Sequence, residues 1–206
     1  MSEQLSLPGF ESVTSNFIRP TNVLRRVWPR HNVFFALLPS AEAGVEIARV
    51  AAQLSQSLGI GGKAVSVDRL HISLRGVGGY LDVPPPEVVR TARFIGDAVA
   101  ASADAFDIVF DHAMSFRNAA AFVLCVGEGL EEVKALRFRL GLAIANAGGP
   151  NKANAFSPHM TLSYRGKVAQ THAIAPLRWT ASTLALIDSH VGESHYEVMG
   201  SWSLRR

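Results

Sequence analysis

Runs of apolar residues divide the chain into strands and helices from about residue 31 onward. The segment 32–39, NVFFALLP, is apolar at successive positions, a pattern typical of a strand buried on both faces. Runs of strand-like composition recur downstream, at residues 64–67, 70–74, 105–116, 121–126, 159–165, 182–191 and 196–204. The pattern therefore predicts a chain rich in short strands.

Three further segments carry apolar residues every three or four positions, which is the period of an amphipathic helix. The first follows Ser40, whose hydroxyl can cap a helix, and it ends at the glycines of 59–62. The second opens at the prolines of 84–86, and the third runs from about Leu130 to Ala147. Because strands and helices do not alternate regularly, the pattern favours an α+β fold with a sheet in two lobes over a doubly wound fold.

An internal repeat relates the two halves of the chain. Phe34 opens FFALLP and Phe122 opens FVLCVG, 88 positions later, and His71 and His159 are separated by the same 88 positions. In each copy an amphipathic helix lies between the strand and the histidine. Two copies of one structural unit predict two pseudo-symmetric lobes, with His71 and His159 facing each other in one central cleft.

Both histidines stand in the pattern His-apolar-hydroxyl-Leu, as HISL and HMTL. Side chains at i and i+2 of a strand point to the same face, so His71 projects with Ser73, and His159 with Thr161. Near neutral pH one imidazole can act as a base and another as an acid, and hydroxyls can donate hydrogen bonds to phosphate oxygens. The set predicts in-line attack on a phosphodiester.

Neighbouring residues offer further contacts to a phosphate or a base. Arg75 and Arg165 follow the two motifs and are candidates to neutralise phosphate charge, or to form salt bridges at strand edges. Phe35 and Tyr164 are candidates to stack on a base, although aromatic residues in strands are more often part of the core.

Other uses of the two histidines fit the sequence less well. A metal site is not expected, since the sequence has no HExxH motif and no cysteine cluster. Asp68 and Asp188 are available, but their spacing does not mark either one as a metal ligand. A serine hydrolase is disfavoured because no GxSxG motif surrounds Ser73 or Thr161. Core histidines would leave the repeat unexplained. The remaining histidines are interpreted as structural or exposed; they are His31, His112, His172, His190 and His195.

Composition indicates an ordinary globular protein, with 48% hydrophobic and 18% charged residues among 206. A net charge of +3 permits an anionic ligand. The single cysteine, Cys125, is predicted to be a small buried hydrophobe, and a lone thiol suits a reducing compartment. The sequence shows no apolar run of membrane-spanning length and no secretory pattern at its start, so a cytoplasmic protein is expected.

Residues 1–30 are predicted to form an extended or partly disordered leader ahead of a single domain at 31–206. Within the leader, residues 4–10 (QLSLPGF) resemble the short peptide by which bacterial proteins dock on the DNA sliding clamp. The leader arginines form either a solvated surface or an RNA-facing patch; they are Arg19, Arg25, Arg26 and Arg30.

The paired motifs resemble those of the two-histidine (2H) phosphoesterase superfamily. Over about residues 31–204, the segments NVFFALLP, LHISLRGVG, SPHMTLSYR and LIDSHVGESHYEVMGSWSL resemble its bacterial branch, called 2′-5′ RNA ligase or RNA 2′,3′-cyclic phosphodiesterase. The resemblance implies antiparallel sheets around a central cleft, and chemistry without a metal or cofactor. It also implies hydrolysis of a 2′,3′-cyclic phosphate, on RNA ends or nucleotides, to a 2′-phosphate; some members join or open 2′-5′ linkages in RNA.

The same resemblance assigns roles to single residues. His71 and His159 would be catalytic, with His159 as the base that activates water and His71 as the acid, and Ser73 and Thr161 would hold the phosphate. The sequence departs from the branch in having Ser73 where threonine is commoner, and glycine where an aromatic residue often follows Arg75. These departures bear on substrate choice rather than on reaction type.

The sequence leaves alternatives open for the ligand. One keeps the site but changes the substrate to another cyclic phosphate or a 2′-5′ oligonucleotide, and another is a non-catalytic RNA-binding module that uses the same groove. The intact pair of His and hydroxyl residues favours an enzyme, since a binder has no need of a matched acid and base. A monomer is expected.

Overall fold

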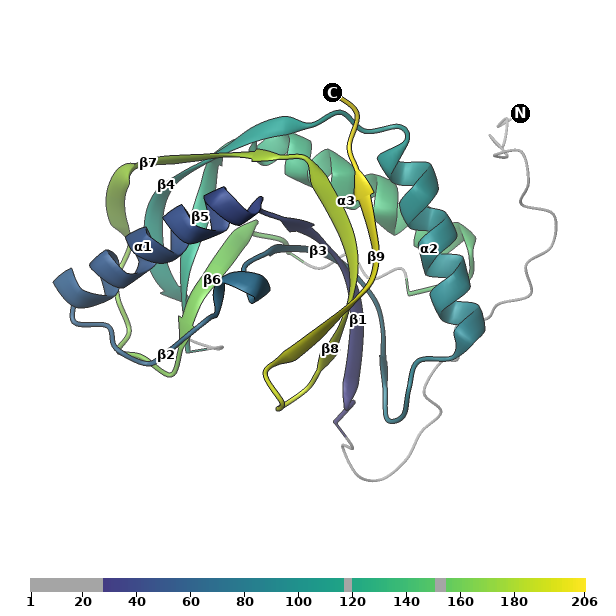
Figure 1. Cartoon of the computed structure of the whole chain (residues 1–206), viewed down its shortest axis with the longest axis horizontal. Helices are drawn as coiled ribbons and strands as arrows, with labels where there is room; N and C mark the ends of the chain where they lie inside the picture. Colours follow the sequence, from purple (N-terminus) through teal and green to yellow (C-terminus); the bar gives the residue numbers. More distant parts are fainter. Residues whose placement is uncertain (1–27, 117–119, 151–154) are drawn as a thin grey trace.

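The computed structural model describes residues 28–116, 120–150 and 155–206 (Figure 1). Its strands are β1 (His31–Leu38), β2 (Lys63–Ala64), β3 (Ile72–Tyr80), β4 (Phe106–Phe116), β5 (Ala121–Glu128), β6 (His159–Tyr164), β7 (His172–Ala181), β8 (Thr183–His190) and β9 (His195–Ser203). Its helices are α1 (Ala41–Ser57), the 3₁₀-helix η1 (Val67–Arg69), α2 (Pro86–Ala100) and α3 (Leu130–Asn146).

These strands form one curled sheet in the order β7-β4-β5-β6-β3-β1-β8-β9, with β2 added beside β6. Every ladder between the named strands is antiparallel. In the middle of the sheet, β3 and β6 are joined through a single residue pair, Ile72 and Met160. The sheet therefore consists of two halves that meet at this seam, in agreement with the predicted α+β fold in two lobes.

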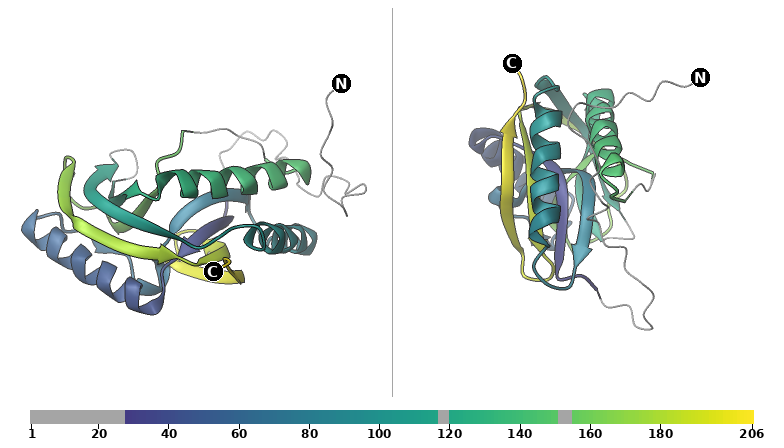
Figure 2. Two further views of the ribbon diagram at one scale, coloured as in Figure 1. Left: turned by 90° about the horizontal axis from the view of Figure 1, so that it is seen from above. Right: turned by 90° about the vertical axis from the view of Figure 1, so that its right-hand side faces the viewer.

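The three α-helices cover one side of the sheet, which we call the outer face (Figures 1 and 2). α2 and α3 pack against each other over β3, β8 and β9, whereas α1 lies over the other half. A single apolar core fills the space between the helices and both halves of the sheet. The opposite side, the inner face, carries two small apolar clusters, Phe34, Ala36, Ala185 and Ile187 in one half and Ala121, Val123 and Cys125 in the other.

Local sequence signals place the helices as predicted. Ser40 caps α1 by accepting a hydrogen bond from the Ala43 amide at 3.2 Å, and α2 begins at Pro86. The strand prediction missed β7, which carries Pro176. That proline falls in a break of the ladder between β4 and β7, at the edge of the sheet, where a missing amide hydrogen is tolerated.

The internal repeat is present, but its strands are offset by 87 positions rather than 88. Ala36 of β1 pairs with the hydroxyl residue of the first motif, and Val123 of β5 pairs with that of the second, so these two residues are equivalent. Phe34 consequently faces the inner side, while Phe122 lies in the main core. The predicted equivalence of Phe34 and Phe122 was therefore wrong by one residue, which reverses the face on which each side chain lies.

Residues 1–27 lie outside the described residues, so the leader and the sliding-clamp-like segment 4–10 stay predictions. Among the residues that are described, no helix is long and apolar enough to cross a membrane. Cys125 is buried as predicted, and burial together with the nearby Asp111 raises the pKa of its thiol to about 11.

Candidate functional site

The two motif histidines lie at the seam between the halves of the sheet. His71 immediately precedes β3 and His159 begins β6, and the residues that follow them, Ile72 and Met160, form the seam pair. Both seam residues are fully buried on the outer face, so the histidines beside them point to the inner face. This antiparallel register directs His71 toward Thr161, and Ser73 toward His159, across the seam. The predicted convergence of two imidazoles and two hydroxyls follows from this arrangement.

Both imidazoles are held by the same hydrogen bond. Nδ1 of His71 donates to the carbonyl oxygen of Arg69 at 2.7 Å, and Nδ1 of His159 donates to that of Ser157 at 2.8 Å. A carbonyl oxygen can only accept, so the hydrogen of each neutral ring stays on Nδ1 and Nε2 is left with a lone pair. The hydroxyl of Ser73 lies 2.9 Å from Nε2 of His71 and donates to it. Each Nε2 is thus available to exchange a proton with a ligand.

Aromatic rings surround the two imidazoles unequally. The ring centroid of His71 lies 5.3 Å from that of Phe34 and 5.4 Å from that of Tyr196. Within the part of the chain that the structure describes, His159 has one close ring, that of Phe116, at 4.7 Å. The rings fix the orientation of the imidazoles and limit the access of water, more so around His71.

Burial and nearby positive charge both act on the ionisable groups of the site. Burial lowers the pKa of the His71 imidazole, and repulsion from Arg69, and from His159 when that ring is protonated, lowers it further, against the opposing effect of the hydrogen bond to the Arg69 carbonyl. The guanidinium of Arg69 lies 4.4 Å from the ring centroid of Tyr196, and burial raises the pKa of that phenol. His71 is therefore neutral in the unliganded protein, in a setting that favours an anion.

The predicted flanking residues have separate outcomes. Tyr164 is exposed on the inner face opposite Ala121, near enough to the Tyr196 phenol to contribute to its raised pKa. Arg165 is exposed directly after β6, with a left-handed backbone at φ 61°. The site is therefore bordered by Tyr164, and Arg165 follows at the end of the same strand.

Phe35 and Arg75 lie on the other side of the sheet from the site. Phe35 is fully buried in the main core, with its ring centroid 6.3 Å from that of Trp202, so it takes the more frequent core position and is no longer a candidate to stack on a base. A β-bulge pairs Arg75 with Phe35 and turns it toward Gly141 of α3. There it lines a pocket of about 280 Å³ together with Arg137, and this pocket contains neither histidine.

The sequence analysis did not identify several residues that form the site. Phe34 and Phe116 contact the imidazoles, Tyr196 approaches from β9, and Arg69 supplies both a carbonyl acceptor and a charge. Strand alternation from Ala36 would have placed Phe34 on the inner face, once the register to the first motif was known. Tyr196 and Arg69 carried no comparable signal, because their contacts depend on how β9 and η1 approach the seam.

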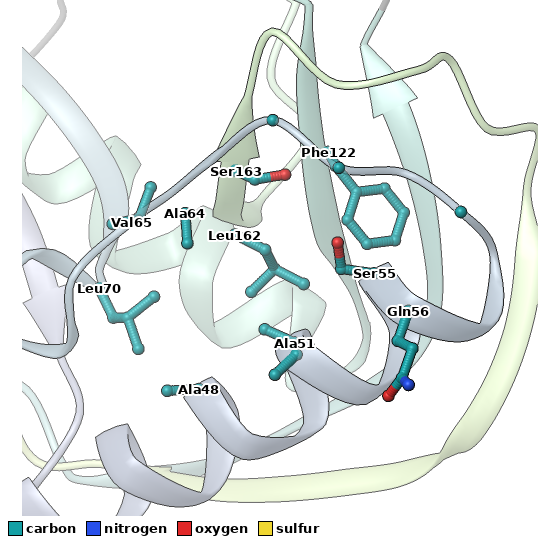
Figure 3. A pocket seen from close by; sticks show the side chains of 14 residues that line it. Ala48, Ala51, Ser55, Gln56, Ala64, Val65, Leu70, Phe122, Leu162 and Ser163 are labelled. Carbon is teal, nitrogen blue, oxygen red and sulfur yellow. The ribbon is translucent and has the colours of Figure 1, made fainter.

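A pocket lies behind the site, on the outer face of β6 (Figure 3). It has a volume of about 650 Å³ between α1 and the strand, and it is lined mainly by small and apolar residues such as Ala48, Ala51 and Leu162. Ser163 also lines it, with a buried hydroxyl oxygen that has no hydrogen-bond partner among the described residues. The strand that presents His159 and Thr161 on one face therefore borders an apolar pocket on the other.

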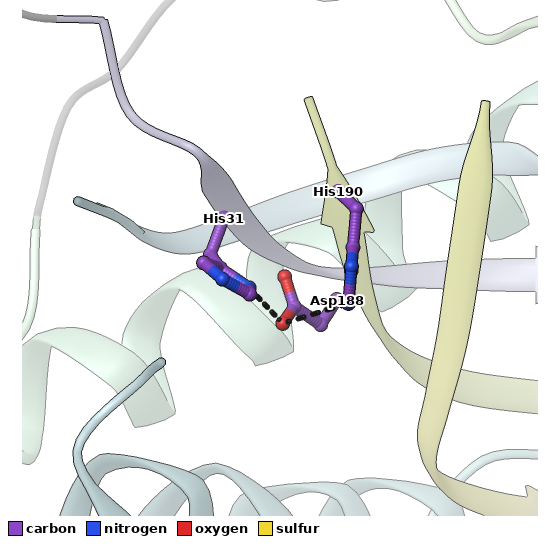
Figure 4. A group of neighbouring side chains, drawn as sticks. All are labelled: His31, Asp188 and His190. Carbon is purple, nitrogen blue, oxygen red and sulfur yellow. Dashed lines mark hydrogen bonds and ion pairs between the residues drawn. The ribbon is translucent and has the colours of Figure 1, made fainter. Parts of the chain in front are cut away.

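Within the described residues, one group of side chains has the composition and spacing to hold a metal ion: His31, Asp188 and His190 (Figure 4). It lies at the ends of β1 and β8 and contains neither motif histidine. No sequence motif pointed to it.

Comparison with known proteins extends over most of the chain. A family model described as the 2′-5′ RNA ligase superfamily matches residues 36–193. Escherichia coli LigT complexed with ATP matches with a TM-score of 0.67 and 18% identity, over 86% of this chain and 99% of LigT. LigT complexed with 3′-AMP matches with a TM-score of 0.66 and 21% identity, again over 86% and 99%.

A protein from another organism has the same fold. TT0787 of Thermus thermophilus matches with a TM-score of 0.66 and 21% identity, over 84% of this chain and 98% of that one. No match was found among curated proteins. At these identities the structural likeness shows a shared fold, and the family model shows the kinship.

Proposed function

The chain belongs to the 2′-5′ RNA ligase superfamily, and from that premise we propose that it is a phosphodiesterase that opens 2′,3′-cyclic phosphates to 2′-phosphates. The observation that carries the proposal is the matched anchoring of His71 and His159, each through Nδ1 to the carbonyl two residues before it. Two such imidazoles, each with the lone pair of the neutral ring on Nε2, are the parts needed for one proton acceptor and one proton donor at a single phosphorus.

In the proposed reaction, water attacks phosphorus in line with the bond to the ribose O3′. Nε2 of His159 takes a proton from the water as its oxygen bonds to phosphorus, and the bond from phosphorus to O3′ breaks. Nε2 of protonated His71 gives its proton to O3′, which leaves a 2′-phosphate. His159 then loses a proton and His71 regains one from solvent, and the hydroxyls of Ser73 and Thr161 donate hydrogen bonds to the non-bridging oxygens.

Binding of the anion changes the protonation of His71. In the unliganded protein burial lowers the pKa of this imidazole, so the ring is neutral. A phosphate beside Nε2 places a negative charge against the imidazolium and opposes that lowering. His71 thus becomes the acid by taking up a proton together with the substrate, in keeping with the assignment of the base to His159.

The inner face suits a nucleotide end as the ligand. Tyr164 is exposed beside the site, and an aromatic ring there can stack on a base without regard to its identity. Escherichia coli LigT, which shares the fold, has been solved in complex with ATP and with 3′-AMP. RNA or a nucleotide that ends in a 2′,3′-cyclic phosphate is therefore the substrate class that we propose.

The test is a turnover assay on 2′,3′-cyclic AMP and on a short RNA that ends in a 2′,3′-cyclic phosphate, with EDTA present. We expect 2′-phosphate as the product, and loss of turnover in His71→Ala and in His159→Ala. His112→Ala is the matched control, because His112 lies on β4 and pairs with Asp111 outside the site. A 3′-phosphate product would refute the proposal, and tight RNA binding without turnover would identify a binding module instead.

The same acid and base can act on a 2′-5′ linkage, because cleavage there also needs a proton moved on each side of phosphorus. We therefore expect the protein to cleave a 2′-5′-linked dinucleotide, and we expect this cleavage to require both His71 and His159. A 3′-5′-linked dinucleotide of the same sequence is the control substrate.

A further inference from the structure

We propose that His31, Asp188 and His190 form a binding site for a divalent transition-metal ion of the Zn²⁺ class, on the outer face of the sheet (Figure 4). We call these three residues the His-Asp-His site. The inference is independent of the proposed reaction, since the site shares no residue with the catalytic constellation.

Strand pairing brings the three side chains together at one end of the sheet. β8 runs between β1 and β9, His190 pairs with His31 on β1, and Asp188 pairs with Val33, a residue of the main core. The preceding residue of β8, Ile187, belongs to the inner-face cluster, so Asp188 points to the outer face. The His-Asp-His site therefore lies on the opposite side of the sheet from His71 and His159.

Distances within the site are close to those of a first coordination shell. Nδ1 of His31 lies 2.7 Å from Oδ2 of Asp188, and Nε2 of His190 lies 3.8 Å from the same oxygen. All three ligand atoms lie within 4.8 Å of one another. Ligand atoms around a tetrahedral zinc ion are separated by about 3.3 Å, so shifts below about 1 Å would complete the geometry.

Two polar atoms of the His-Asp-His site are buried without a hydrogen bond to any described residue. Within the described residues, Oδ1 of Asp188 and Nε2 of His190 are buried and lack a hydrogen-bond partner. The Asp188 side chain is only 2% exposed, so its unpaired oxygen is also kept from bulk water. Buried polar atoms in folded proteins are nearly always partnered, and a metal ion would satisfy both of these at once.

Nearby carboxylates support a cation at this position. Oε2 of Glu197 lies 3.9 Å from Nε2 of His190, which makes it a candidate for a fourth ligand. On the far side of the same ring, Oε2 of Glu193 lies 3.6 Å from Nδ1, where it favours the tautomer with hydrogen on Nδ1. That tautomer leaves Nε2 free to bind the ion.

Ligand chemistry selects the class of metal. Two imidazole nitrogens with one or two carboxylates suit Zn²⁺ and the neighbouring first-row ions, whereas Mg²⁺ and Ca²⁺ prefer shells made of oxygen. A hydrogen bond between His31 and Asp188 alone would account for one carboxylate oxygen. That hydrogen bond would leave two atoms without a partner among the described residues: Oδ1 of Asp188, and Nε2 of His190, which lies beside the same carboxylate.

The test is titration of the chelator-stripped full-length protein with Zn²⁺, followed by calorimetry, and with Co²⁺, followed by visible absorption. The protein carries His71→Ala and His159→Ala, so that metal bound by the catalytic imidazoles cannot contribute. We expect one equivalent to bind, with the intense absorption of tetrahedral Co²⁺ and a rise in melting temperature. His190→Gln and Asp188→Asn should each weaken binding by at least about tenfold.

His112→Gln is the matched control, since His112 pairs with Asp111 but belongs to no group of three metal-ligand side chains among the described residues. If Asp188→Asn fails to fold, Glu197→Gln and His190→Gln, both on partly exposed side chains, carry the test. Absence of binding, or binding that neither His190→Gln nor Asp188→Asn weakens, would overturn the proposal. Equal weakening by His112→Gln would do the same.

Discussion

His71 and His159 occupy equivalent places in the two halves of the sheet, and their surroundings are alike in one respect and different in another. Each donates Nδ1–H to a carbonyl two residues upstream, and each is followed by a seam residue. Yet His71 packs against the rings of both Phe34 and Tyr196, whereas among the described residues His159 has the one close ring of Phe116. The repeated motif fixes the tautomer, and the surroundings decide which imidazole is more strongly desolvated.

This division explains how a symmetric motif can perform an asymmetric reaction. Hydrolysis needs one base and one acid, and two identical imidazoles would have no preference between the roles. Tyr196 and Arg69, which surround His71, come from β9 and η1 rather than from the motif. The asymmetry therefore arises from Tyr196, which lies outside the repeat, and from the charge of Arg69 at the position where the second copy has Ser157.

The largest effect is expected from removing either imidazole. General acid or base catalysis contributes roughly 10²- to 10⁴-fold, so His71→Ala and His159→Ala should each lower kcat by about 10³-fold. Because the two act on one transition state, the double variant should be little worse than either single one. Steady-state kinetics on 2′,3′-cyclic AMP measure this, and independent, multiplying effects would contradict a coupled pair.

Removing the hydroxyl of Ser73 or that of Thr161 should lower activity less than removing a histidine does, and the two losses should be about equal. A hydrogen bond to a charged group contributes about 1.5–3 kcal/mol, so Ser73→Ala and Thr161→Ala should each lower kcat/KM by roughly 10- to 150-fold. Ser73→Thr should retain activity, since it keeps the hydroxyl. A large loss in only one alanine variant would show that the two halves do not share the phosphate.

Removing the aromatic ring that covers one imidazole should reduce the difference in burial between His71 and His159 while keeping both histidines. Tyr196→Ala admits water to His71 and should raise the pKa of that imidazole toward its ordinary value, because burial is the main cause of its lowering. Nuclear magnetic resonance titration of the ring protons measures the change. Phe116→Ala, which opens the wall of His159, is the control and should leave the His71 titration in place.

The smallest effect concerns stability. The pKa of His71 is lowered in the folded protein. As the pH falls below the ordinary imidazole value of about 6.5, this histidine is therefore protonated in the unfolded chain before it is protonated in the folded one, which favours unfolding. Stability from this group is complete above that pH and is lost as the pH drops toward the lowered pKa. His71→Asn should therefore lose less free energy of unfolding than the wild type between about pH 7.5 and 5.5. Equal losses in urea denaturation would contradict this.

The sequence was sufficient for the parts of the molecule that depend on local pattern. The helix cap at Ser40, the proline start of α2 and the two motifs needed only spacing and residue type. Face assignments within strands were less reliable, since a bulge in β3 turned Arg75 toward α3 and a shift of one residue exchanged the roles of Phe34 and Phe35.

Contacts between distant segments could not be predicted at all. Tyr196 reaches His71 only because β9 joins the sheet beside β8, and the His-Asp-His site exists only because β1 and β8 pair. Neither pairing leaves a periodic signal in the sequence. Edge strand β7 escaped prediction for a related reason, because its proline obscures the strand pattern that its partner β4 enforces.

The pairing of β1 with β8 also governs how the protein can be made. Hydrogen-bonded residues on these strands, such as His31 and Asp188, are 157 positions apart. At about 5–20 residues per second, a ribosome needs roughly 8–30 s to supply the second strand after the first. During that interval β1, with five consecutive buried residues in the finished fold, lacks β8, one of the two strands that flank it. The nascent chain therefore exposes an edge of an aggregation-prone strand until β8 has been made, and a chaperone that shields short apolar segments should raise the yield of folded protein.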